Sequence, residues 1–305
     1  MHSNPLVTIQ IPTYNQKQYI KEALDSALAQ NYENLQVIVA DDCSPDFDIF
    51  DYLSEYKNNP KVLIHRNEIN LGRVGNYRST LYNLVKGDWF VNLDGDDQFD
   101  NIQFLGEAIE QIISKSEAFN IVSFEFNHGL EYIKKHVRSF QDLNAGNIVV
   151  HGLDYLMLQK HYQNFMHANT IFNTATAKQV DFYNRDILTV DFFSALKIYT
   201  QGDLILSAKR IFTWNDHGKN ASYCSSIEDI KNEKLAILDF SKYVQKKLSS
   251  KDCNTLIYVL EFFLFKKVFN IYKLKKKDLN FYKYVIFNMK LNKFYIKKLI
   301  IEFLN

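Results

Sequence analysis

The chain has 305 residues, of which 47% are hydrophobic and 23% charged, with only 10 Gly and 4 Pro. This composition excludes a collagen-like or wholly disordered chain, and the length suits one large domain or a catalytic domain with an appendage. The net charge of +1 is unevenly divided, because residues 1–230 carry 19 Lys and Arg against 29 acids, whereas residues 231–305 carry 17 Lys against 6 acids. Such asymmetry indicates two roles in one chain.

Buried strands and amphipathic helices alternate along the first hundred residues. Continuous apolar runs predict the strands, and apolar residues at helical spacing predict the helices between them. The expected strands are Val7–Ile11, Leu35–Ala40, Lys61–Arg66 and Trp89–Leu93, and the expected helices are Lys17–Gln30, Phe50–Tyr56 and Gly75–Lys86. This alternation predicts an α/β fold in which helices flank both faces of a parallel sheet.

From about Ile121 the pattern changes to mixed strands and loops. Expected strands here are Asn147–Gly152, Thr170–Ala175 and Ile205–Trp214, and a helix is expected at Asp191–Tyr199. After Ser222 the chain has no Gly or Pro and is rich in Lys, Phe, Tyr and Leu. That composition predicts several helices up to the C-terminus.

Polar or acidic clusters follow three of the expected strands: Thr13–Asn15, Asp41–Asp42 and Asp94–Asp97. Ligands of parallel sheets bind beyond the carboxyl ends of the strands, so we expect these clusters to converge. Asp94, Asp96 and Asp97 repel one another unless a cation or hydrogen-bond donors offset their charge. Mg²⁺ and Mn²⁺ prefer such oxygen ligands. A solvated Asp-rich turn accounts for the same residues, so the cluster alone leaves metal binding open.

The first hundred residues also resemble a known family. The segment VTIQIPTYNQKQYIKEALDSALAQNYENLQVIVADDCSPD resembles the opening of family 2 glycosyltransferases, and NLGRVGNYRSTLYNLVKGDWFVNLDGDDQFD resembles the stretch leading into their D-x-D signature. The resemblance implies the GT-A fold, a Rossmann-like, mixed but mostly parallel sheet flanked by helices, here followed by an all-helical extension. It further implies an inverting, metal-dependent (Mn²⁺ or Mg²⁺) transfer of a hexosyl or N-acetylhexosaminyl group from a nucleotide-sugar, with a UDP-sugar favoured.

The resemblance also assigns roles to single residues. The expected contacts of the nucleotide-sugar are Pro12, Thr13, Tyr14, Asp41, Asp42, Arg78, Asp94 and Gly95. The expected metal ligands are Asp96, Asp94 and His217, with Asp97 as a supporting carboxylate. Asp191 matches the family's catalytic base and would take the proton from the acceptor hydroxyl. Asp191 could instead be a helix N-cap, and His217 could be structural.

The resemblance implies a nucleotide-sugar-binding half at residues 1–115 and an acceptor-binding half at 116–225, and the charge and composition predict a basic, aromatic-rich helical extension at 226–305. In the extension, Phe262–Phe287 has the pattern of an amphipathic helix on anionic lipid. Packing on the catalytic domain or in a homo-oligomer is the alternative. The expected acceptor is a glycan or lipid-linked glycan, and nucleic acid is disfavoured because the extension lacks arginine.

The cysteines and the hydropathy of the chain indicate its cellular compartment. Cys43, Cys224 and Cys253 form neither a disulfide framework nor a CxxC metal site, which favours a reducing environment. The N-terminus lacks a signal-peptide pattern, and apolar runs such as Leu256–Phe265 are too short to span a bilayer. We therefore expect a cytoplasmic protein, with peripheral attachment to the cytoplasmic face of the membrane as an alternative.

Two other functions stay open at this stage. A nucleotidyltransferase also pairs carboxylates with a metal, but it would show a Gly-rich basic loop where this chain has Pro12–Asn15. A non-catalytic scaffold that binds nucleotide-sugar would not need intact Asp94, Asp96 and Asp191. His151, His161 and His167 fit no zinc spacing, and we interpret most of them as ordinary loop or helix residues.

Overall fold

A computed structural model describes residues 4–113, 119–123, 129–143, 146–159, 167–215 and 227–274. Its N-terminal part contains the strands β1 (Val7–Thr13), β2 (Leu35–Asp41), β3 (Val62–Arg66) and β4 (Trp89–Asn92). Between them lie α1 (Ile20–Leu28), α2 (Ile49–Tyr52), the 3-10 helix η1 (Ser54–Tyr56) and α3 (Gly72–Asn83). Every strand and helix predicted for this part is present with ends that shift by a few residues, except that the single helix predicted at Phe50–Tyr56 is divided into α2 and η1.

The following part is more irregular. Its elements are β5 (Gln98–Phe99), α4 (Phe104–Ile113), β6 (Phe119–Ser123), α5 (Gly129–His136), β7 (Phe140–Asp142), β8 (Ile148–Val150), α6 (Gly152–Leu158), the 3-10 helix η3 (His167–Asn169), β9 (Thr170–Asn173), α7 (Thr174–Gln179), α8 (Val190–Ile198), β10 (Asp203–Leu206) and β11 (Phe212–Thr213). The single strand predicted at Ile205–Trp214 is wrong, because β10 and β11 belong to different sheets. The predicted strand Thr170–Ala175 ends early because Asn173 caps α7, accepting from Thr176 N.

The strands of the described residues form one large and one small sheet. The large sheet has nine strands in the order β3-β2-β1-β4-β9-β6-β10-β8-β7, and β5 pairs with β11 in the small one. In the large sheet seven strands run in one direction, and only β9 and β8 oppose them. The mostly parallel sheet predicted from the sequence is therefore confirmed. The antiparallel β9 lies directly beside β4, after which the acidic cluster begins.

The core lies on both faces of the large sheet. Along β2, Ile38 and Ala40 contribute to one apolar cluster, whereas Val37 and Val39 contribute to the other. Successive side chains of a strand point to opposite faces, so a strand buried on both faces has an unbroken apolar run. Each fully buried Val or Ile contributes about 1.5–3 kcal/mol. This packing rigidly sets the carboxyl ends of the strands, where the candidate site lies.

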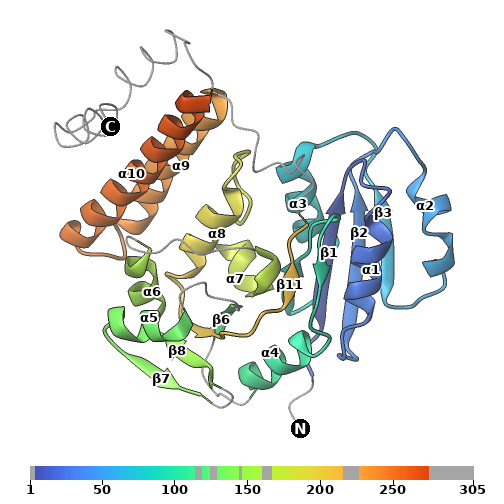
Figure 1. Cartoon of the computed structure of the whole chain (residues 1–305), viewed down its shortest axis with the longest axis horizontal. Helices are drawn as coiled ribbons and strands as arrows, with labels where there is room; N and C mark the ends of the chain where they lie inside the picture. Colours follow the sequence, from blue (N-terminus) through green and yellow to red (C-terminus); the bar gives the residue numbers. More distant parts are fainter. Residues whose placement is uncertain are drawn as a thin grey trace.

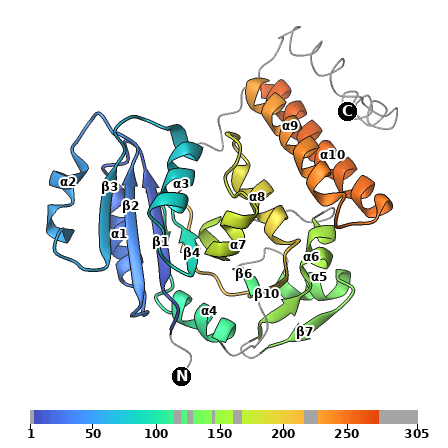
Figure 2. The same ribbon diagram turned by 180° about the vertical axis from the view of Figure 1, so that it is seen from behind.

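Two long helices, α9 (Ile227–Val244) and α10 (Ser250–Leu274), lie side by side at the opposite end of the molecule from α2 (Figures 1 and 2). Apolar side chains of α9, including Phe240 and Val244, belong to the same core cluster as those of α8. Thr189 donates to Glu233 of α9 at 3.1 Å, and Arg185 forms an ion pair with Asp239. Among the helices of the described residues, none combines the length and the apolar character needed to cross a membrane.

Candidate functional site

The three polar clusters that follow β1, β2 and β4 meet at one edge of the sheet. Gly95 donates its backbone N–H to the carbonyl oxygen of Pro12 at 3.2 Å, and Asp42 donates its backbone N–H to Thr13 at 2.9 Å. A Cβ at Gly95 would lie 2.7 Å from Gln16 Oε1 and 3.0 Å from Thr13 Oγ1, so glycine permits this close approach. The expected convergence of the three segments is thus present in the backbone itself.

Around this edge, Tyr14 is exposed, whereas Pro12 and Thr13 are buried. Thr13 donates its hydroxyl to Gln16 Oε1 at 3.1 Å. Asn15 adopts a left-handed backbone conformation (φ 55°), and its N–H donates to Ser44 Oγ at 2.8 Å. The loop after β1 is therefore fastened to the loop after β2, and Tyr14 projects from it toward solvent.

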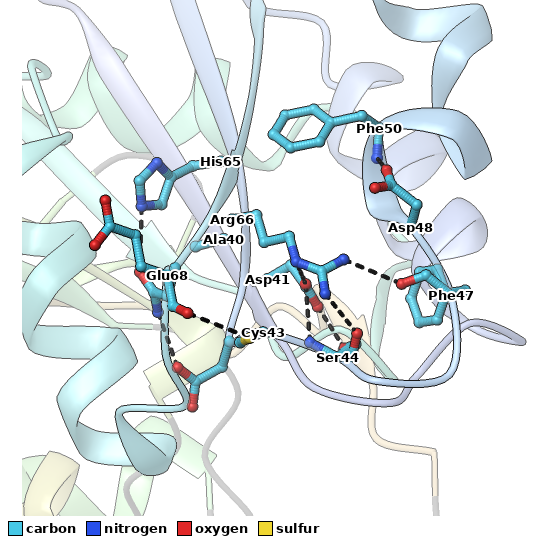
Figure 3. A network of polar contacts seen from close by, with 12 residues as sticks. Ala40, Asp41, Cys43, Ser44, Phe47, Asp48, Phe50, His65, Arg66 and Glu68 are labelled. Carbon is cyan, nitrogen blue, oxygen red and sulfur yellow. Dashed lines mark hydrogen bonds and ion pairs between the residues drawn. The ribbon is translucent and has the colours of Figure 1, made fainter.

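Asp41 and Asp42 are both buried, but they have different partners. Asp41 accepts from the Ser44 backbone at 3.0 Å and from the Ser44 hydroxyl, and Arg66 Nε lies 3.7 Å away. Arg66 also donates to the carbonyls of Ser44 (2.9 Å) and Phe47 (3.2 Å), so Asp41 and Arg66 together hold the loop after β2 (Figure 3). Asp42 Oδ1 accepts from the Asn67 side chain and the Leu71 backbone, both at 2.8 Å.

Asp94 follows β4 and is held by three side chains. Its Oδ1 accepts from the Tyr77 hydroxyl at 2.7 Å and from Asn92 Nδ2 at 3.2 Å, while Oδ2 lies 3.1 Å from His167 Nε2. Burial acts to raise the pKa of Asp94, but the charge and hydrogen bond of His167 outweigh it, so the pKa lies well below its usual range. Burial raises the pKa of Tyr77, which keeps its hydroxyl a hydrogen-bond donor.

His167 is the site residue that the sequence did not single out. It lies in η3 at the start of β9, it is 7% exposed, and its ring packs edge-on against Tyr77 with centroids 5.6 Å apart. Burial lowers its pKa, but the attraction of Asp94, and then of Asp191, dominates and leaves the pKa raised. Only the pairing of β9 with β4 brings His167 to Asp94, and no spacing in the sequence signals that pairing.

Asp191 enters the same site from the second half of the chain. It lies in the first turn of α8, whose N-cap is Thr189, so Asp191 is not the N-cap. Its Oδ2 is 3.9 Å from His167 Nδ1, and its side chain is 22% exposed. Because Asp94 lies on the other nitrogen of the same imidazole, His167 stands between the two carboxylates. Asp191 is therefore a partly exposed carboxylate beside the acidic cluster that follows β4.

Two arginines of α3 connect it to the second half of the chain. Arg78 donates to the carbonyl of Phe182 at 3.0 Å and pairs with Asp181 at 2.8 Å, so its guanidinium is directed to the loop after α7. The guanidinium of Arg73 lies over the ring of Tyr77, 5.4 Å from its centroid, and donates to the carbonyls of Ile187 (3.0 Å) and Leu188 (2.8 Å). Arg73 therefore fixes the segment that leads into α8 and to Asp191.

The remaining acids crowd the cluster with negative charge. Asp97 is buried and accepts from the Asn215 backbone at 2.9 Å, and Asp96 is half-buried. Burial, then the charge of Asp94, raises the pKa of Asp97 to about 7. Within the described part of the chain, no three His, Cys, Asp or Glu side chains are arranged so that they could hold a metal ion. His217, an expected ligand, lies outside the described residues.

Comparison with known sequences gives one family. The model of "Glycosyl transferase family 2" matches residues 8–190. The putative colanic acid biosynthesis glycosyl transferase WcaA of Escherichia coli is 32% identical over 99 residues, covering 32% of this chain and 35% of that protein. An uncharacterized glycosyltransferase of Rickettsia felis is 26% identical over 258 residues, covering 79% of this chain and 41% of that protein. The alignments thus span well under half of these relatives' length.

Solved structures share the fold at low identity. Residues 1–349 of S. aureus TarS in complex with UDP-GlcNAc give a TM-score of 0.62 at 17% identity, covering 83% of this chain and 70% of that chain. The mannosyltransferase PcManGT from Pyrobaculum calidifontis, in complex with GDP-Man and Mn²⁺, gives 0.56 at 17% identity, covering 85% and 71%. The expected GT-A fold is therefore confirmed.

Proposed function

The chain belongs to glycosyl transferase family 2, and we propose that it transfers a sugar from a nucleotide-sugar, with inversion, to a hydroxyl of a glycan or lipid-linked glycan. The observation that carries this proposal is the placement of Asp94 and Asp191 on the two nitrogens of His167. Asp94 belongs to the expected D-x-D signature, and Asp191 is the expected catalytic base. A UDP-sugar is the favoured donor, in keeping with the UDP-GlcNAc complex of TarS.

The donor would bind at the edge where β1, β2 and β4 end. Pro12, Thr13 and Tyr14 would line the base and ribose, with Asp42 as the carboxylate that meets the base. Asp41 supports the same surface through Ser44 and Arg66. Gly95 lets the segment after β4 approach β1 closely. Arg78 is the further residue proposed to face the nucleotide, and its partners Phe182 and Asp181 indicate that it also joins α3 to the second half of the chain.

Asp191 would act as general base. It takes the proton of the acceptor hydroxyl while that oxygen attacks the anomeric carbon. As the new C–O bond forms, the bond between the anomeric carbon and the diphosphate breaks, and its electron pair leaves with the phosphate oxygen. A general base contributes about 10²–10⁴-fold to rate. Arg73, which holds the segment before α8, keeps the carboxylate at this position.

The acids after β4 fit a divalent cation by their chemistry. Asp94 and Asp96 offer carboxylate oxygens, which Mg²⁺ and Mn²⁺ prefer, and such ions commonly take one or two carboxylates plus substrate phosphates. Burial raises the pKa of Asp97 most, and the charge of Asp94 raises it further; a cation beside these carboxylates would offset that repulsion. When bound, the ion would stabilise the charge that the diphosphate gains on leaving. His217 is a further candidate ligand.

The basic extension is proposed to place the enzyme beside its acceptor. Residues 231–305 carry 17 Lys against 6 acids, and each cation near an anionic membrane surface contributes about 1 kcal/mol of attraction. Among the described helices, α9 packs on α8 and α10 packs on α9, which accounts for apolar side chains on both. A peripheral position on the cytoplasmic face would suit a lipid-linked acceptor.

A thermal-shift panel of UDP-, GDP- and dTDP-sugars, each with and without Mn²⁺, tests this function. A donor at 100 times its Kd stabilises the folded state by about 2.7 kcal/mol, which is readily measured. We expect one nucleotide class to stabilise the protein, and Mn²⁺ to enlarge that effect. Absence of any shift with every nucleotide-sugar, in both conditions, would overturn the proposal.

A further inference from the structure

A row of buried polar side chains lies behind the acidic cluster. Gln10 of β1 donates to Asn92 Oδ1 of β4 at 2.8 Å, and Asn92 Nδ2 lies 3.3 Å from His167 Nε2. All three residues are buried. Burying polar groups costs free energy unless they are hydrogen-bonded, so each member constrains its neighbour. The row ends at Asp94, which accepts from Asn92 at 3.2 Å.

The ring of His167 is held from several sides. Its backbone precedes β9, in which Ile171 is paired with Val91 of β4. One side of the ring packs against Tyr77, and Tyr77 in turn donates to Asp94. Because both the backbone and the ring are fixed by strands and by packing, the imidazole has little freedom to turn. A ring held in this way can define the distance between the groups at its two nitrogens.

The two nitrogens of His167 face two different carboxylates. Nε2 lies 3.1 Å from Asp94 Oδ2, whereas Nδ1 is buried, lacks a hydrogen-bond partner among the described residues, and has Asp191 Oδ2 at 3.9 Å. A buried polar atom without a partner costs about 1–3 kcal/mol. A movement of Asp191 by less than one ångström would bring it within hydrogen-bond distance, because that bond needs about 3 Å.

We propose that His167 is a positioning residue. Its two ring nitrogens face Asp94 and Asp191, and the ring fixes the position of Asp191, the proposed base, relative to Asp94 at the proposed donor site. The inference rests on the proposed function, in which Asp191 is the base. His167 acts through the two carboxylates and need not touch either substrate. Misplacement of a reacting group by about 1 Å costs on the order of 100-fold in rate, so a spacer of this kind has a measurable effect.

Two conservative variants separate the two contacts. In His167→Gln the amide nitrogen can take the place of Nε2 and keep the contact with Asp94, whereas in His167→Asn it can take the place of Nδ1 and keep the contact with Asp191. We expect kcat of His167→Gln to fall about 100-fold with little change in the KM of the donor. We expect His167→Asn to keep more of kcat and to raise that KM. His151→Gln, an exposed histidine at the start of α6, is the matched control.

The assay measures the release of nucleotide from one nucleotide-sugar, chosen as the one that gives the largest thermal shift. The reaction contains Mn²⁺, and the acceptor is free N-acetylglucosamine or water. A double-mutant cycle with Asp191→Asn then tests whether His167 acts through the base. We expect His167→Gln to add less than about threefold to the loss in Asp191→Asn.

The outcomes are distinguishable. Wild-type kcat in His167→Gln, or a full further loss in the Asp191→Asn background, would overturn the role of His167 while leaving the proposed function intact. A wild-type protein that no nucleotide-sugar of the panel stabilises would overturn the proposed function, and this inference with it. Unfolding curves of both His167 variants show whether a loss of kcat comes from a loss of fold. Destabilisation alone would not lower kcat in His167→Gln while raising KM in His167→Asn.

Discussion

Asn215, which follows Asp97 by 118 residues, donates its backbone N–H to Asp97 Oδ1 at 2.9 Å. The bond ties the segment after β11 to the acidic cluster after β4, so both halves of the chain contribute to one site. Even with this donor, burial and the neighbouring charges raise the pKa of Asp97 to about 7. A buried acid with such a pKa makes the stability of the fold depend on pH.

We predict that Asp97→Asn becomes increasingly stabilising, relative to the wild type, as pH rises from about 4 to about 7. In that range the folded protein keeps the Asp97 proton, which the unfolded chain with its pKa of 3.8 has lost. The unfolding free energy of the wild type therefore falls with rising pH, and asparagine removes this loss. The gain should be on the order of 2–4 kcal/mol above pH 7 in metal-free buffer.

Urea denaturation of both proteins at several pH values provides the measurement. Asp46→Asn, at an exposed carboxylate, is the control and should show no such trend. Mn²⁺ bound at the cluster should abolish the advantage of Asp97→Asn, because the cation favours the ionised acid. A constant difference between the two proteins across pH 4–8 would contradict the charge account of the cluster.

Asp96→Asn should remove the metal-dependent part of donor binding. If Asp96 is a ligand of the divalent ion, the variant keeps the stabilisation that a nucleotide-sugar gives without metal but loses the increment that Mn²⁺ adds. Thermal shifts with and without Mn²⁺ measure both quantities. Asp100→Asn, at an exposed acid of the same region, should retain the increment. An undiminished Mn²⁺ effect in Asp96→Asn would exclude that residue as a ligand.

Gly152→Ala should destabilise the fold by at least about 2 kcal/mol. A Cβ at this position would overlap with the carbonyl oxygens of Tyr199 and Gly202, which are backbone atoms and cannot move aside as a flexible side chain would. Gly106→Ala, inside α4 and 3.3 Å from a single carbonyl, should change stability by less than about 1 kcal/mol. Chemical denaturation measures the unfolding free energy of both variants. Equal unfolding free energies would contradict the close packing of Gly152 against the backbone of Tyr199 and Gly202.

Phe240→Ala should cost about 3–5 kcal/mol, because the ring is 1% exposed and packs into the core shared by α8 and α9. Leu238→Ala, on the same helix but 43% exposed, should change stability by about 0.5 kcal/mol or less. Urea unfolding measures both. If Phe240→Ala were as harmless as Leu238→Ala, α9 would not be part of the folded catalytic core.

The residues before Asp97 were the predictable part of the fold. Unbroken apolar runs such as Leu35–Ala40 identify buried parallel strands, and the polar residues after them identify the edge where ligands bind. The later elements were harder because they are short and their partners are distant in the sequence. β10 and β11 are separated by only a few residues, yet they join different sheets, which no local pattern reveals.

The candidate site, too, could be predicted from the sequence only in part. Asp94 and Asp191 were expected from motifs, whereas His167 reaches them only because β9 inserts antiparallel beside β4. A lone histidine carries no signal of this kind in its spacing. Arg73 was not singled out for a similar reason: its contacts, like those of Arg78, depend on how α3 faces the segment from Asp181 to Leu188.

The most direct test of the account is to measure donor binding and sugar transfer side by side in Asp191→Asn. We predict that the variant binds the nucleotide-sugar with a Kd within about threefold of the wild type, while its kcat for transfer falls about 10²–10⁴-fold. Asp186→Asn, at an exposed acid just before α8, should behave as wild type in both measurements. Wild-type transfer by Asp191→Asn would contradict the claim that this carboxylate is the base.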